Sequence, residues 1–159
     1  MEPGMLDASP YFYGSAENKL NAKGQVAIPA RFRSVLPDSD QSGNFVIIHG
    51  EDQCLYMYTH RQFAKIKDNA RRIAEETGDS GFYRSFMAEA CAVDLDTQGR
   101  FVLPQLFLKA AGIRGQGVLF IGMDDRIEIW EPTVYAASRG ESGKYEELRK
   151  KAAKRIFGI

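Results

Sequence analysis

One motif occurs twice in this chain, and the repeat limits the folds that its 159 residues can adopt. Residues 21–32, NAKGQVAIPARF, recur 75 positions later as residues 96–107, DTQGRFVLPQLF. The copies share a glycine and a proline, which are Gly24 and Pro29 in the first copy and Gly99 and Pro104 in the second. The spacing predicts two copies of one small unit that pack against each other.

A second similarity follows each copy of the motif. Residues 46–58 resemble residues 118–130 at an offset of 72, which aligns Gly50 with Gly122. Each half therefore has one predicted plan: a strand, a glycine turn, a strand, a short helix opened by proline, a hairpin and another helix. Pro37 and Gly112 are expected to end the short helices.

The segment between the copies has the pattern of two helices. Thr59 and Gln62 form a predicted capping box in front of the first helix. The helices carry apolar residues at helical spacing, Phe63, Ile66, Ala70 and Ile73 in the first and Phe82, Phe86 and Ala90 in the second. These stripes are expected to pack within the chain or to line a boundary between subunits.

Two small hairpins leave unpaired strand edges that need cover. We therefore expect an α+β fold in which the two halves interlock into one β-barrel with pseudo-twofold symmetry and flanking helices. The expected units are a flexible extension at 1–10, a first repeat with its helix at 11–76, a linking helix with the second repeat at 77–138, and a helical tail at 139–159.

Composition favours a globular protein of the reducing cytosol. The chain is 44% hydrophobic and 26% charged, and 21 Lys and Arg balance 21 Asp and Glu. This balance excludes a uniformly basic nucleic-acid coat and an acidic tail. No apolar stretch approaches 18 residues and the start does not resemble a signal peptide, so we expect no membrane partner and a cytoplasmic location. Cys54 and Cys91 do not suggest a disulfide framework.

The residues do not favour catalysis. His49 and His60 have no Ser, Cys or carboxylate at a spacing that suits nucleophilic catalysis. Cys54 lies near both histidines without a metal-ligand pattern, and no phosphate-binding glycine loop is present. We expect no enzymatic activity, no metal, no cofactor and no small-molecule substrate.

The duplicated segment, GQVAIPARFR at 24–33 and its copy from Gly99 to Phe107, resembles the SpoVT/AbrB family of DNA-binding domains. The resemblance implies a swapped-hairpin, AbrB-like barrel. The duplication resembles bacterial regulators of this family, which implies sequence-specific binding of double-stranded promoter DNA at short direct repeats upstream of the protein's own operon. It further implies that this operon holds division and cell-wall genes, that the protein acts as a repressor, and that it associates with the nucleoid.

The family motif places Asp four residues before Arg, with Gly directly before the Arg. The second copy has this motif intact as Asp96, Gly99 and Arg100. In the first copy Asn21 replaces the Asp and Gln25 replaces the Arg. We expect Asp96 and Arg100 to form an ion pair or cap across the turn, with Arg100 as a secondary DNA contact.

A basic strip surrounds the first copy. The segment 11–34 contains one acid, Glu17, and four cations, Lys19, Lys23, Arg31 and Arg33. These cations are the predicted phosphate contacts, and Gln25 is the predicted probe of a base edge. A solvated surface is the simpler interpretation of such a strip. Because Gln25 lacks charge, a protein-binding scaffold or an antitoxin-like dimerisation module remains the alternative function.

The chain is expected to form a ring-like homo-oligomer. One subunit offers few cations to DNA, whereas several subunits on repeated sites gain avidity. The two halves differ, so one half of a subunit can contact the other half of the next. The basic tail has apolar residues three to four positions apart, which favours packing on a neighbour with the charges solvated. Binding of nucleic acid or of a membrane is the alternative for the tail.

Overall fold

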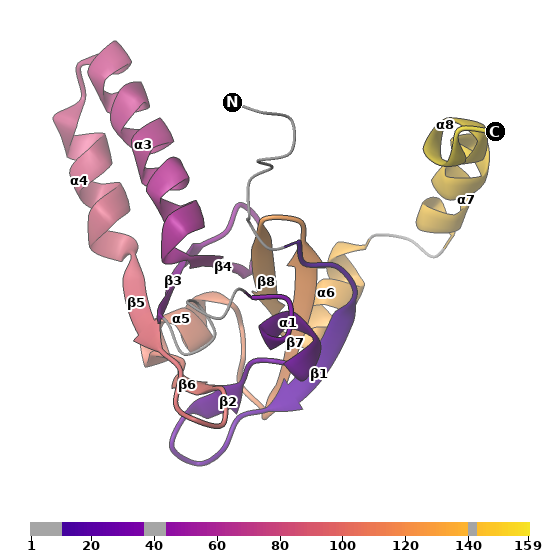
Figure 1. Ribbon diagram of the computed structural model, residues 1–159, viewed down its shortest axis with the longest axis horizontal. Coiled ribbons are helices and arrows are strands. Elements are labelled where there is room, and N and C mark those ends of the chain that lie inside the picture. The colour runs from indigo at the N-terminus through magenta and orange to yellow at the C-terminus, as the bar shows by residue number, and fades with distance from the viewer. Residues whose placement is uncertain (1–10, 37–43, 140–142) are drawn as a thin grey trace.

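The computed structural model describes residues 11–36, 44–139 and 143–159. The expected extension at 1–10 and the helix stop at Pro37 lie outside these residues. The first repeat contains β1 (Ser15–Lys19), β2 (Gln25–Ala27), α1 (Ala30–Arg33), β3 (Asn44–His49), β4 (Leu55–Thr59) and α3 (His60–Thr77). Helix α4 (Ser80–Glu89) links it to the second repeat (Figure 1).

The second repeat has the same order of elements, as the repeated sequence predicts. It contains β5 (Cys91–Asp94), β6 (Arg100–Val102), α5 (Gln105–Ala110), β7 (Gly117–Met123), β8 (Arg126–Trp130) and α6 (Pro132–Ser138). The tail forms α7 (Lys144–Lys151) and α8 (Ala153–Phe157). Pro29 and Pro104 are the N-cap residues of α1 and α5, and Gly112, with a φ of 72°, follows α5 as expected.

The strands of one repeat pair mainly with strands of the other. An antiparallel sheet has the order β1-β7-β8-β4-β3-β5, and β2 pairs with β6 in a separate ribbon. In the ribbon Val26 lies opposite Phe101, its own counterpart in the repeat. In the large sheet Tyr56 lies opposite its counterpart Glu128. In both places a residue faces its own counterpart in the other repeat. Such pairing is expected on the pseudo-twofold axis that the duplication predicts.

The register corrects the ungapped alignment of the second similarity. Asn18 pairs with Val118, and the counterpart of Asn18, Val93, pairs with Phe45. Phe45 is therefore the counterpart of Val118, 73 positions away, whereas β4 and β8 correspond at the offset of 72. The predicted alignment of 46–50 with 118–122 is wrong by one residue, because the first hairpin is one residue longer. A slip of one residue exchanges the two faces of a strand.

The core lies where the two repeats meet. It includes Val26, Phe101, Phe120, Leu55 and Ile127, which are all buried. The hydrogen bonds of the described residues form a six-stranded sheet and a two-stranded ribbon. The expected α+β class is confirmed. The strand pairing of the described residues does not show the closed barrel that the sequence predicted.

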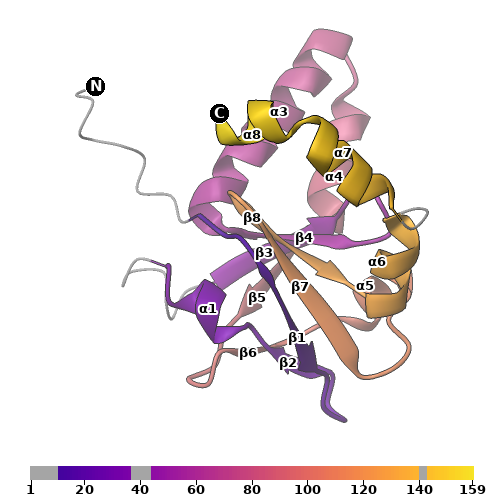
Figure 2. The same cartoon turned by 90° about the vertical axis from the view of Figure 1, so that its right-hand side faces the viewer.

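Helices α3 and α4 form a hairpin at the opposite end of the molecule from the β2–β6 ribbon (Figures 1 and 2). The Thr59 hydroxyl accepts a hydrogen bond from the Gln62 N–H, which confirms the predicted cap. Near the sheet, Phe63 stacks on Phe86 with ring centroids 6.4 Å apart. The basal part of the two apolar stripes therefore packs within the chain. Toward the tip, Ile73 and Phe82 remain 48% and 42% exposed.

Candidate nucleic-acid interface

The repeated motif builds the β2–β6 ribbon and the turn before each of its strands. Ile28 N–H donates to the Gly99 carbonyl at 2.8 Å, and Leu103 N–H donates to the Gly24 carbonyl at 3.0 Å. Both glycines have a φ of 76°, a left-handed conformation that other residues rarely adopt. The two motif glycines thus hold the turns together across the pseudo-twofold axis.

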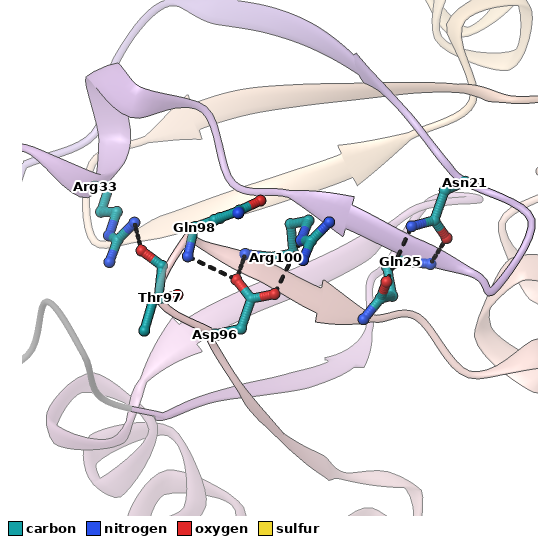
Figure 3. A network of polar contacts seen from close by, with 7 residues as sticks. All are labelled: Asn21, Gln25, Arg33, Asp96, Thr97, Gln98 and Arg100. Atoms are coloured by element: carbon teal, nitrogen blue, oxygen red, sulfur yellow. Dashed lines mark hydrogen bonds and ion pairs between the residues drawn. The ribbon is translucent and has the colours of Figure 1, made fainter.

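The turn of the second repeat holds a charged pair. Asp96 Oδ1 accepts from the N–H groups of Gln98 and Arg100 at 2.8 and 2.9 Å. Asp96 Oδ2 accepts from Arg100 Nε at 2.9 Å (Figure 3). The expected ion pair and the expected cap are both confirmed.

The turn of the first repeat has the same geometry without charge. Asn21 Oδ1 accepts from the N–H groups of Lys23 and Gln25, both at 2.9 Å. Asn21 Nδ2 donates to Gln25 Oε1 at 3.0 Å. The first turn therefore holds a neutral amide pair at the two positions where the second turn holds an ion pair. The shared spacing of four residues was the sequence signal for this correspondence.

The two turns leave different groups free for a ligand. The Gln25 oxygen accepts from Asn21, whereas its NH₂ group has no partner among the described residues. Arg100 uses Nε on Asp96, and its two terminal nitrogens have no partner within 11–36, 44–139 and 143–159. Each strand of the ribbon thus presents hydrogen-bond donors whose orientation is held by the preceding turn.

The four predicted cations do not form one cluster. Lys19 ends β1 and Lys23 lies in the first turn, and their ammonium groups are exposed and contact no described partner. Arg31 donates from Nη1 to the Ser15 carbonyl at 3.2 Å, at the start of β1. Arg33 donates from Nη1 to the Thr97 carbonyl at 3.4 Å, in the turn of the second repeat.

Arg33 therefore belongs spatially with the second copy of the motif. Figure 3 shows it beside Thr97 at one end of the ribbon, away from Asn21 and Gln25 at the other end. A Cβ added at Gly99 would lie 2.9 Å from Arg33 Nη1, so the guanidinium lies directly on that glycine. The candidate interface thus has an end with Lys23 and an end with Arg33 and Arg100.

The pKa of the Asp96 carboxylate lies below the ordinary value for an aspartate. The hydrogen bond from the Arg100 N–H contributes most to the lowered pKa, followed by the side chain of Arg100 and the N–H of Gln98. A depressed pKa means that the folded state binds this proton less readily than the unfolded state. Asp96 therefore stabilises the fold at neutral pH, and this contribution is lost as the pH falls through the folded-state pKa.

Asp96→Asn tests this contribution. The amide retains an oxygen for the Gln98 and Arg100 N–H groups, as Asn21 does in the first turn, but it cannot be protonated in this range. We expect the stability of the variant to depend less on pH below about 4 than that of the wild type. Denaturant titrations across the acid range measure this difference, and parallel pH curves would contradict it.

The cysteine and histidine side chains that the sequence offers for chemistry have surroundings typical of structural residues. Burial raises the pKa of the Cys54 thiol to about 12, so it is not a thiolate at neutral pH. The His49 ring packs on Phe107 with centroids 4.9 Å apart. Among the described residues, no cluster of three or more His, Cys, Asp or Glu residues could hold a metal ion. None of the described helices has the length and apolar character that a membrane crossing requires.

Comparison with known proteins identifies similar chains. The profile of the family described as "MraZ protein, putative antitoxin-like" matches residues 11–80 and 86–157. A "Transcriptional regulator MraZ" of Acetivibrio thermocellus is 31% identical over 150 residues, which is 93% of this chain and 99% of that protein. Proteins with the same name match in Cytophaga hutchinsonii, at 32% identity over 79% of this chain and 82% of the relative, and in Thermoanaerobacter pseudethanolicus, at 34% over 85% and 92%.

Proposed function

Because this chain belongs to the MraZ family, we propose that it is a transcriptional regulator that binds promoter DNA in a sequence-specific manner. The family is one of regulators, and the chain is not an enzyme. The observation that carries the DNA-binding proposal is the β2–β6 ribbon, on which two related turns orient Gln25 and Arg100.

The ribbon suits base recognition. A two-stranded β-ribbon fits the major groove, where an Arg fork recognises guanine and amide donors bond acceptor atoms of the bases. Arg100 and the Gln25 NH₂ group are the base-reading groups of this proposal. Lys19 and Lys23 near the first turn, Arg33 beside the second turn and Arg31 at the start of β1 bind phosphates in this proposal, which positions the ribbon on the duplex.

The proposed architecture is the swapped-hairpin barrel of AbrB-like proteins. Its support is the pairing of β1, β2, β3 and β4 with strands of the other repeat. Within it, 11–76 and 77–138 act as two interlocked units, and 139–159 is a separate tail. The ribbon then lies on the pseudo-twofold axis and presents one neutral and one charged turn.

A ring of several subunits completes the proposal. A single ribbon offers few cations, so one subunit binds DNA weakly at physiological salt. Neighbouring subunits of a ring engage successive short direct repeats, which makes each further contact intramolecular. The DNA sites lie upstream of the protein's own operon, with its division and cell-wall genes, and binding there represses transcription at the nucleoid.

An antitoxin-like dimerisation module is the second candidate. The neutral Asn21–Gln25 pair favours it, because the first turn offers no guanidinium to DNA. Selection of bound sequences from genomic fragments separates the two functions. Regulation predicts enrichment of promoter fragments with short direct repeats. No enrichment, together with stable capture of one partner protein, would support the dimerisation module instead.

The double variant Asn21→Asp/Gln25→Arg tests base reading by the first turn. It recreates the ion pair of the second turn and leaves the net charge of the protein unchanged. We expect about tenfold tighter binding to the promoter repeats, because a positioned Arg fork discriminates bases by about 1–3 kcal/mol. Fluorescence anisotropy with labelled promoter DNA measures the change.

Gln25→Arg alone is the matched control for this variant. It adds a positive charge beside the neutral Asn21, so it should raise affinity for all sequences and steepen the salt dependence. If the double variant binds promoter DNA no better than the wild type, residue 25 does not read bases.

A further inference from the structure

The hydrogen bonds of the first turn run in one direction, which the backbone fixes. Asn21 Oδ1 accepts from the backbone N–H groups of Lys23 and Gln25, both at 2.9 Å. A backbone N–H can only donate, so the oxygen of the Asn21 amide must face these two groups. The Asn21 NH₂ group then faces the side chain of residue 25 and needs an acceptor there. Gln25 Oε1 is that acceptor, at 3.0 Å, so the turn determines the orientation of both amides.

This orientation decides what Gln25 offers to a ligand. A glutamine amide carries a donor and an acceptor side by side. Figure 3 shows the Gln25 oxygen turned toward Asn21 and the nitrogen pointing away from it. Gln25 is the neighbour of the buried Val26 in β2, so it lies on the outer face of the ribbon. The donors of Gln25 are therefore available on that face, whereas its acceptor is directed into the turn.

The second turn offers donors alone by a different chemistry. Arg100 lies beside the buried Phe101, so it is on the same outer face as Gln25. Its guanidinium has no acceptor atom, and its Nε is held by Asp96 at 2.9 Å. One neutral turn and one charged turn thus present the same kind of hydrogen-bonding group.

The edges of the bases in the major groove distinguish such a group from an ordinary glutamine. Adenine has an acceptor, N7, next to a donor, the N6 amino group, and a free glutamine amide bonds both. Guanine has two adjacent acceptors, O6 and N7, and cytosine has the N4 amino donor. With its oxygen held by Asn21, Gln25 can bond both acceptors of guanine, but it meets the amino group of adenine or cytosine with another donor.

We propose that Asn21 is a positioning residue that sets the base specificity of residue 25. It holds the Gln25 amide with its donors outward, so that Gln25 selects guanine and discriminates against adenine and cytosine. The inference rests on the DNA binding of the proposed function. Under it, the neutral first turn recognises the same class of base edge as the charged second turn.

Asn21→Asp tests the inference because it inverts the Gln25 amide. One oxygen of the new carboxylate still accepts from the backbone N–H groups of the turn, as Asp96 Oδ1 does in the second turn. Its other oxygen can only accept, so Gln25 must turn its NH₂ group inward and its oxygen outward. An outward oxygen accepts from cytosine N4 or adenine N6. We expect about tenfold preference for guanine in the wild type and about tenfold preference for cytosine or adenine in the variant.

Selection from duplex DNA with a randomised core, by the full-length protein, measures these preferences. Gln25→Ala identifies the base pair that residue 25 reads, because the preference there should disappear. Lys23→Gln is the matched control, since it changes the net charge of the same turn by as much as Asn21→Asp and leaves the amide pair in place. It should weaken binding to all sequences and leave the base preference unchanged. Asp96→Asn should retain guanine at the base read by Arg100, because a guanidinium exposes only donors in any orientation.

NMR of the isotopically labelled protein reads the amide orientation without DNA. The Gln25 NH₂ protons should exchange with water as a free amide does in the wild type, and more slowly in Asn21→Asp, where one of them bonds the carboxylate. The same exchange rate in both proteins would overturn the proposed orientation.

The selections separate the inference from the proposed function. A wild-type preference for adenine, a Gln25→Ala variant with unchanged base preferences, or an Asn21→Asp variant that behaves as Lys23→Gln would each overturn the inference and leave DNA binding intact. If the wild type selects no sequence while NMR shows the expected amide orientation, the proposed function is wrong, and the base specificity is refuted with it.

Discussion

Replacing Lys19 and Lys23 together with alanine is expected to weaken promoter binding about a hundredfold at physiological salt and to flatten its salt dependence. Both ammonium groups are exposed and have no partner among the described residues. Neither therefore loses an internal contact on substitution, so stability should change by less than about 0.5 kcal/mol. In the proposed ring every subunit would lose two of the proposed phosphate contacts, which multiplies the effect.

The measurement is DNA affinity over a series of salt concentrations, with non-specific DNA in parallel. The slope of log affinity against log salt should fall by roughly one unit for each lost phosphate contact. Lys67→Ala/Arg72→Ala is the matched control, because it removes the same charge from α3, at the end of the molecule opposite the ribbon (Figure 2). Equal losses in the two variants would show that net charge, and not the ribbon, determines affinity.

Phe101→Ala should produce the largest loss of stability, about 3–5 kcal/mol. Phe101 is 1% exposed, faces its counterpart Val26 across the ribbon, and makes an edge contact with Phe120 at 6.4 Å. Truncation leaves a cavity between the two repeats. The two paired ribbon strands hold the backbone in place, so the surrounding side chains cannot move in to fill this cavity. Because the strands of the repeats interleave, both repeats should lose stability in one transition.

Val102→Ala is the control in the same strand. Its side chain is 53% exposed on the outer face of the ribbon, so the expected loss is below about 0.5 kcal/mol. Chemical denaturation followed by circular dichroism compares the two variants. Two separate transitions in the Phe101 variant, or a loss as small as that of Val102→Ala, would contradict a core shared by both repeats.

The sequence by itself determined the features that depend on near neighbours. The capping box of Thr59 and Gln62 joins residues three apart, and the pair of Asp96 and Arg100 joins residues four apart. The repeated motif also predicted the order of strands and helices in both halves. Such features are readable because backbone conformation and local hydrogen bonds depend on residue type over a few positions.

Only the tertiary structure decided which distant residues meet. The extra residue in the first hairpin displaced the alignment of β3 with β7, because strand register depends on turn length and on which face of the strand is buried in the core. Arg33, assigned with Lys23 from the sequence, lies instead beside Thr97 of the other repeat. Pairing between repeats brings together residues more than sixty positions apart, and no local pattern specifies that geometry.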